Sequence, residues 1–240
     1  MIYLKLFSTE NDYLAYRDSK DYIKPNVSRS DDKGSVYYNY PPPITYSYVD
    51  LGLPSGTKWA TMNVGASKPS DAGLYFQWGD TSGYTADQVG KDKQFSWSDY
   101  KWNPSGDGKT FTKYTTGATL ELEDDAANAN MGGDWHMPTP TQIQELLDNT
   151  TNTWTQQNNV NGYLFTSKTD GSKSIFIPAA GYASDGSLHN EGSEADVWSS
   201  VLNMSGVNGG QYLYFYPSVI YLDNSYGNRY YGFSVRGVLG

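Results

Sequence analysis

A six-residue alternation near the C-terminal end constrains this chain most: QYLYFY at residues 211–216. Aromatic and β-branched residues favour strands, and successive side chains of a strand point to opposite faces. We therefore expect Leu213 and Phe215 to point into a core. The three tyrosines of this strand are expected to point outward: Tyr212, Tyr214 and Tyr216. Because exposed groups of large aromatic side chains mark interaction sites, the alternation predicts a recognition surface on a sheet.

Tyrosine is concentrated in this part of the chain, since residues 197–238 hold seven of its 22 tyrosines. Tyrosine gives a large contact area at a small cost in conformational entropy, and neighbouring serine, glycine and asparagine add adaptable hydrogen bonds. An alternative interpretation is that tyrosines simply suit half-buried strands. The alternation favours the binding surface, because it places three tyrosines on the face opposite the apolar residues.

Composition narrows the class of protein. With 240 residues the chain can bury one good-sized core and carry a small added module. The net charge of −9, without a cluster of Lys or Arg, argues against nucleic acid and anionic membranes as partners. The absence of cysteine excludes disulfides, thiolate metal sites and cysteine nucleophiles. No apolar run is long enough for a signal peptide or a membrane span, so we expect a soluble chain that stays in the cytoplasm.

The first 43 residues differ from the rest of the chain. Residues 2–7 alternate like a strand, and the turn signal at residues 31–34 precedes a second strand at residues 35–40. Three prolines at residues 41–43 then favour a semi-rigid spacer. We expect a small β module at 1–43 and the main domain at 44–240. Since two or three strands are marginally stable alone, the module is expected to pack on the main domain, on its own copies or on a larger assembly.

The main domain is expected to belong to the α+β class. Thr139 and Gln142 form a capping box around Pro140, which predicts a helix at residues 140–148. A second short helix is predicted at residues 124–130, with acids in its first turn. Short strands separated by Gly, Asn, Asp and Ser turns are predicted at residues 74–78, 162–167, 174–178, 197–200, 211–216 and 231–238.

Six sequence blocks, in order from about residue 46 to residue 238, carry a family resemblance: VDLGLPSGTKWATMNVG, GLYFQWGD, EDDAANANMGGDWHMPTPTQIQELL, IFIPAAGY, VWSS and RYYGFSVRGV. On these blocks the chain resembles the paralogous surface domain of Bacteroidetes and Fibrobacter proteins. That domain is a variant of the C-type lectin-like fold, which formylglycine-generating enzymes share. The resemblance implies a C-type lectin-like fold with two short helices and many short antiparallel strands.

Two groups of residues have side chains that could carry chemistry. The first group is an acidic cluster of Glu121, Glu123, Asp124 and Asp125, which could ligate calcium or could be a solvated helix start. The calcium motifs of carbohydrate-binding C-type lectins are absent from the sequence. His136 and His189 are too few for a zinc site without cysteine, and no serine has the context of a catalytic nucleophile. Formylglycine-generating enzymes use a cysteine pair that this chain lacks. We therefore expect no enzyme activity, no metal and no cofactor.

Large residues in the family blocks are expected in the core. Trp59, Trp78, Trp135 and Trp198 are assigned to it, although tryptophans could also form a sugar-stacking platform. Arg236, which apolar residues flank, is expected to pair with a carboxylate inside the fold.

The C-terminal region resembles the variable proteins of diversity-generating retroelements, which present a hypervariable surface on this same fold. In that family, phage tropism determinants at tail-fibre tips bind bacterial receptors, and mainly AAY-type codons are randomised. Residues 198–236 fit this pattern, because they lack Lys and Glu and are rich in residue types that such codons can reach. The resemblance implies a variable region at about 197–236. Its binding face, called here the predicted variable face, consists of Val197, Val201, Leu202, Asn203, Ser205, Val207, Tyr212, Tyr214, Tyr216, Val219, Tyr221, Asp223, Asn224 and Tyr226.

The partner implied by this resemblance is a protein or glycan receptor on a bacterial cell. Residues 1–43 resemble an opening of Bacteroides phage and prophage structural proteins, which implies an attachment module, a virion location at the tail-fibre tip and a homotrimer. The alternative is a carbohydrate- or protein-binding lectin-like module of fixed specificity on a bacterial surface adhesin. That alternative lacks calcium motifs and needs an export signal.

Overall fold

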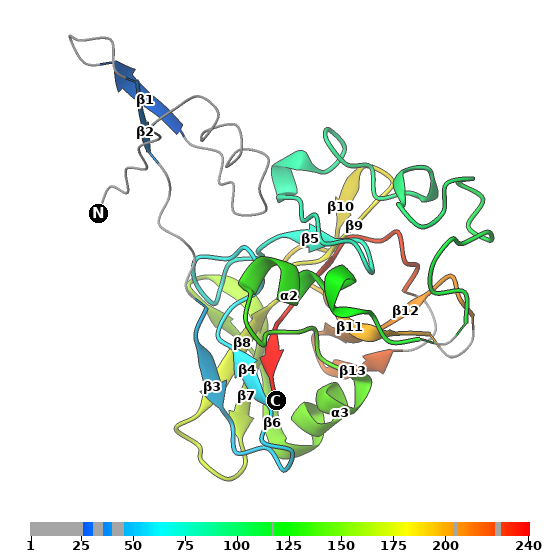
Figure 1. Ribbon diagram of the computed structural model, residues 1–240. Helices are drawn as coiled ribbons and strands as arrows, with labels where there is room; N and C mark the ends of the chain where they lie inside the picture. Colours follow the sequence, from blue (N-terminus) through cyan, green and yellow to red (C-terminus); the bar gives the residue numbers. More distant parts are fainter. Residues whose placement is uncertain (1–25, 31–35, 40–45, 117, 204–205, 224–226) are drawn as a thin grey trace. The chain divides into compact units, whose positions relative to one another are not determined.

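The computed structural model in Figure 1 describes residues 26–30, 36–39, 46–116, 118–203, 206–223 and 227–240. The chain divides into two compact units, Met1–Thr45 and Tyr46–Gly240. The division lies close to the boundary expected after residue 43. In the first unit, β1 (Asn26–Ser30) pairs antiparallel with β2 (Val36–Asn39), where a strand was predicted at residues 35–40. The strand predicted at residues 2–7 lies outside the described residues.

The second unit is a mixed α+β fold, largely built from small sheets. Its helices are the 3-10 turns η1 (Ala86–Gln88), η2 (Trp97–Asp99) and η3 (Leu122–Asp124), and the α-helices α2 (Ala126–Met131) and α3 (Pro140–Asn149). Its strands are β3 (Tyr48–Asp50), β4 (Lys58–Ala60), β5 (Tyr75–Phe76), β6 (Thr150–Gln157), β7 (Val160–Ser167), β8 (Ser174–Pro178), β9 (Tyr182–Ser184), β10 (Ser187–His189), β11 (Ala195–Leu202), β12 (Gly210–Tyr216), β13 (Val219–Asp223), β14 (Phe233–Ser234) and β15 (Val238–Leu239). None of the helices in the described residues is long and apolar enough to cross a membrane.

Local signals position both α-helices. At the start of α3, the Thr139 hydroxyl accepts from the Gln142 amide N–H, and the Gln142 side chain accepts from the Thr139 N–H, which confirms the capping box. Helix α2 begins later than predicted, because Leu122–Asp124 form the turn η3 instead. The Asp125 carboxylate then caps α2 by accepting from the Asn128 N–H at 2.9 Å.

A five-stranded sheet in the order β13-β12-β11-β14-β5 is the centre of the unit. Strands β11, β12 and β13 are antiparallel neighbours, with Val197 opposite Leu213 and Leu213 opposite Leu222. Helix α3 packs against these three strands (Figure 1). Leu213 and Phe215 are fully buried in the cluster that also contains Ile143 of α3, as the alternation predicted.

The opposite face of the same sheet packs into a second cluster. Trp198 lies directly across from Tyr212, and its ring stacks on Phe233 with centroids 4.0 Å apart. The indole N–H of Trp198 donates to the Phe76 carbonyl oxygen at 2.8 Å, and that of Trp78 donates to the Ser199 carbonyl oxygen at 3.0 Å. Trp59, Trp78, Trp135 and Trp198 are all buried, which confirms their assignment to the core.

The strand predicted at residues 231–238 is two strands. β14 pairs with β5 and β11 in the central sheet, whereas β15 pairs with β4 in a second sheet. Arg236 lies between them and is fully buried. The prediction that Arg236 pairs with a carboxylate was wrong. Its guanidinium donates at 2.9 Å to Asn63 Oδ1 and to the carbonyl oxygens of Ala60 and Phe176, so three neutral acceptors satisfy it. Burial lowers the pKa of Arg236 to about 9.

Candidate ligand-binding site

Four tyrosines form a continuous group on β12 and β13. Tyr212, Tyr214 and Tyr216 follow one another on the same face of β12, and Tyr221 of β13 lies directly across from Tyr214. Neighbouring ring centroids are 6.2 Å apart for Tyr212 and Tyr214, and 5.6 Å apart for Tyr214 and Tyr216. Exposure increases along the strand, from 5% at Tyr212 to 40% at Tyr216, and Tyr221 is 42% exposed. The group therefore leads from the core to the solvent.

Part of the predicted variable face is buried, contrary to expectation. Tyr212 does point away from Leu213, but Trp198 and Phe233 cover it, with ring centroids 5.9 and 4.9 Å from its own. Asp223 is directly opposite Tyr212 and is buried beside it. Alternation assigns a residue to a face of the sheet, but it does not say whether another element covers that face.

Three other residues of the predicted variable face are buried for different reasons. Val197 lies on the α3 side of β11, in the same cluster as Leu213. Leu202 packs in the second cluster, with Trp198. Asn203 is buried, and its N–H donates to the Gly209 carbonyl oxygen at 2.8 Å. These positions serve the fold and are not open to a ligand.

The rest of the predicted variable face is accessible or outside the described residues. Val201, Val207 and Val219 are half-buried, as is Tyr214, whereas Tyr216 and Tyr221 are exposed. Ser205, Asn224 and Tyr226 lie outside the described residues. The accessible tyrosines are thus Tyr214, Tyr216 and Tyr221.

A pocket of about 190 Å³ opens beside the tyrosine group. It is lined by Tyr182, Glu194, Asp196, Tyr212, Tyr214, Tyr231 and Phe233. Five of the seven lining side chains are aromatic, and the other two are carboxylates. Sequence reasoning named only Tyr212 and Tyr214 of this set as site residues. The pattern that could have found the two acids is EAD at residues 194–196, since it places them two apart at the start of a strand.

Asp196 is the most unusual group in the pocket. It lies on β11 directly across from Tyr214 and is only 3% exposed. Its Oδ2 is buried and has no hydrogen-bond partner among the described residues. Burial, and then the negative charge of Glu194, raise the pKa of Asp196 well above its ordinary value. Glu194 itself accepts from the Asn190 side-chain amide at 2.7 Å.

The carboxylates near the pocket also raise the pKa values of the tyrosine hydroxyls around it. Burial is the main cause that raises the pKa of Tyr182, Tyr212 and Tyr214, and nearby carboxylate charges raise each further. Glu194 and Asp196 are the carboxylates that act on Tyr182 and Tyr214. The pocket therefore combines aromatic walls with two carboxyl groups.

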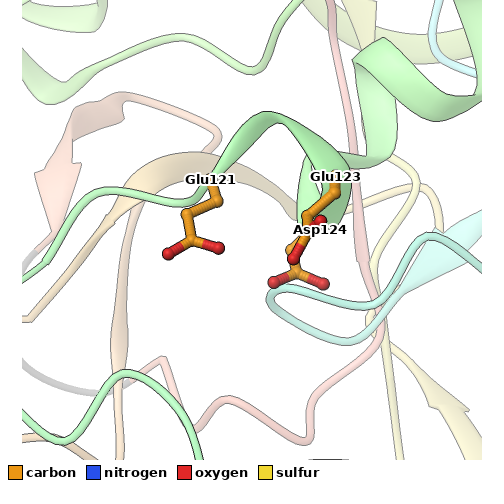
Figure 2. Close-up of side chains that lie close together, drawn as sticks. All are labelled: Glu121, Glu123 and Asp124. Carbon is orange, nitrogen blue, oxygen red and sulfur yellow. The ribbon is translucent and has the colours of Figure 1, made fainter.

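The acidic cluster of Glu121, Glu123 and Asp124, which could ligate calcium, is paired with the side chain of Lys113. Figure 2 shows Glu121 on the approach to η3, with its side chain near those of Glu123 and Asp124. The ammonium of Lys113 lies 2.6 Å from Glu121 Oε2, 3.0 Å from Glu123 Oε1 and 2.6 Å from Asp124 Oδ2. Lys101 lies 3.2 Å from the other oxygen of Asp124. Asp125 points elsewhere, since it caps α2 and accepts from the Met137 N–H. The cluster is thus an ion-pair network as it stands.

The two histidines make local structural contacts. His136 Nδ1 lies 3.0 Å from the Met137 carbonyl oxygen. His189 Nε2 lies 3.1 Å from the Ser184 hydroxyl, and its ring stacks on Tyr182 with centroids 4.9 Å apart. Neither set of contacts forms a triad of nucleophile, base and carboxylate within the part of the chain that the structure describes.

Comparisons with known proteins leave the family unassigned. No protein-family model matches the chain, and searches of curated proteins and of solved structures find no significant match. Membership of a family therefore stays a prediction from the sequence blocks.

Proposed function

We propose that the Tyr46–Gly240 unit is a ligand-binding domain with a C-type lectin-like fold, of the kind found in retroelement-diversified receptor-binding proteins of phage tail fibres. Its ligand is a protein or glycan receptor on a bacterial cell. The observation that carries the proposal is the tyrosine group. Tyr216 and Tyr221 are exposed at the outer end of β12 and β13, while Leu213 and Phe215 on the other face build the core.

The two faces of β12 differ in a way that supports ligand binding: one packs in the core and the other carries the exposed Tyr216. Large aromatic side chains are costly to leave in water, and exposed groups of them mark interaction sites. Tyr214 and Tyr221 contact each other across the strands, so the exposed rings are held in place before a ligand arrives. Pre-organised tyrosine surfaces bind at a reduced entropic cost.

The test is a binding assay of the full chain on bacterial cells, with Tyr216 and Tyr221 changed together to Ser. We expect the double variant to lose binding to receptor-bearing Bacteroides cells while its melting temperature stays within a few degrees of the parent. Tyr48→Ser is the matched control, because Tyr48 is 49% exposed but lies on β3 in a different sheet. Full binding by the double variant would show that the recognition face lies elsewhere.

A lectin-like module of fixed specificity is the second candidate, and one observation favours it. Val197 and Leu202 belong to the predicted variable face but are buried in the core. Randomising a core position usually destabilises a fold, by roughly 2–5 kcal/mol for large-to-small changes. Sequencing the gene in a population of phage or host cells separates the candidates. Adenine-directed variation confined to the C-terminal codons supports diversification, and an invariant region supports fixed specificity.

A further inference from the structure

The aromatic pocket beside the tyrosine group has the composition of a cation site. Among the described residues, its lining includes two carboxylates, Glu194 and Asp196, and no Lys or Arg. Four tyrosines and Phe233 form the rest of the wall. Ring faces carry negative quadrupolar charge and attract ammonium and guanidinium groups. The walls and the carboxylates therefore favour the same sign of ligand charge.

The unpartnered oxygen of Asp196 indicates where such a group would bind. A buried polar atom without a hydrogen-bond partner is costly. Asp196 Oδ2 lacks a partner among the described residues, and Asp196 is one of the residues that line the pocket. An N–H donor on a cationic ligand would supply both the missing hydrogen bond and the opposite charge.

Size and ligand number argue against other occupants. Pockets for drug-sized ligands are typically about 300–1,000 Å³, whereas this one is about 190 Å³. It suits a group the size of one side chain. Calcium requires about six to eight oxygen ligands, and a wall of five aromatic residues and two carboxylates does not offer that set. An anionic group would meet repulsion from both carboxylates.

We infer that this pocket binds an organic cation of the ligand, an alkylammonium or guanidinium group, with Asp196 as its hydrogen-bonded counter-ion and the tyrosine rings around it. The inference deepens the proposed function and depends on it, since it names the chemistry of the group that the binding domain recognises. Such a cation can come from a Lys or Arg side chain of a receptor protein or from an amino sugar. Either would present it at the end of a short polar or aliphatic stem.

The experiment is calorimetric titration of the full chain with n-butylammonium and with butan-1-ol, its neutral analogue of similar shape. We expect saturable binding of butylammonium and at least about tenfold weaker binding of butanol. Asp196→Asn keeps the shape of the side chain but removes its charge, so it should weaken butylammonium binding by about tenfold or more. Asp134→Asn is the control, since Asp134 is exposed and does not line the pocket. Nα-acetyl-lysine methylamide and glucosamine then separate a protein side chain from an amino sugar as the source.

Each outcome decides the inference. Equal binding of butylammonium and butanol would identify an apolar pocket, and unchanged butylammonium binding by Asp196→Asn would remove the counter-ion; either result overturns the inference. Binding of N-acetylglucosamine in place of both amines would do the same and would indicate a neutral sugar site. The proposed function fails separately, since it is overturned only when the Tyr216 and Tyr221 double variant keeps full binding to cells. A melting curve for each variant confirms that it is folded.

Discussion

Tyr214 of β12 and Tyr221 of β13 face each other across the edge of the central sheet, with ring centroids 5.3 Å apart. Tyr221 is open to solvent, while Tyr214 also lines the carboxylate pocket. The pair thus joins an exposed aromatic surface to a recessed acidic one. A ligand that covers Tyr221 would have the pocket directly beside it.

Tyr212 and Tyr216 should respond differently to the same substitution. Tyr212→Ser removes a buried ring from Trp198 and Phe233 and should destabilise the fold by about 3 kcal/mol. Tyr216→Ser should change the free energy of unfolding by no more than about 0.5 kcal/mol, because its ring is 40% exposed. Urea denaturation measures both. Equal effects would mean that the gradient of exposure along β12 is wrong.

Leu213→Ala should be severely destabilising. Leu213 is fully buried in the cluster that it shares with Val197 and with Ile143 of α3, and its truncation leaves a cavity that costs about 2–5 kcal/mol. Denaturation midpoints with an unchanged slope would show this loss of stability. If Leu213→Ala folds as stably as the parent while Tyr216→Ser does not, β12 faces the other way.

Asp196→Asn should change how stability depends on pH. The pKa of Asp196 is raised in the folded chain, so the folded state holds its proton to a higher pH than the unfolded state does. The parent therefore loses stability as pH rises from the ordinary value of 3.8 through the raised pKa, by about 1.4 kcal/mol for each unit of elevation. The variant lacks this loss, and its advantage should grow as the pH rises from 3.8 through the raised pKa of Asp196.

Other titratable groups surround Asp196 and define the control for that experiment. Glu194 and Asp223 act on it through their negative charges, whereas Tyr182, Tyr212 and Tyr214 titrate above this pH range. Asp134→Asn, which alters an exposed carboxylate, should keep the pH profile of the parent. A parallel profile for Asp196→Asn would show that Asp196 is not buried as a costly charge.

Chelation should leave the melting temperature of the parent unchanged, because the Lys113 ammonium already pairs with all three carboxylates of the cluster, Glu121, Glu123 and Asp124. Lys113→Met removes that ammonium, so the melting temperature of this variant should be lower and should rise with added calcium. Scanning calorimetry with and without EDTA measures both proteins. A fall of several degrees in the parent, reversed by calcium, would establish a native metal site.

Removal of residues 1–45 should leave the remaining unit folded, since Tyr46–Gly240 is a compact unit with its own core. The oligomeric state should change if the first unit is an attachment module, and light scattering on both proteins measures it. An insoluble or unfolded truncation would show instead that the first unit completes the core.

Sequence reasoning succeeded where the signal is local. The capping box at Thr139 places the start of α3, and the alternation places Leu213 and Phe215 in the core. It failed where distant segments meet. Phe233 covers Tyr212, and Tyr182 completes the pocket around Asp196, yet neither is close to its partner along the chain. No short-range pattern reports such contacts, because they depend on the path of the chain between strands.

The switch of residues 233–239 from the central sheet to β4 has a consequence for how the Tyr46–Gly240 unit folds. Val238 pairs with Trp59, and Arg236 donates to the Ala60 and Phe176 carbonyl oxygens between them. Strand β4 therefore completes its hydrogen bonds only when β15, far along the chain, pairs with it. Contacts between such distant segments form slowly, so partly folded forms of the Tyr46–Gly240 unit keep apolar surface exposed until this pairing is made.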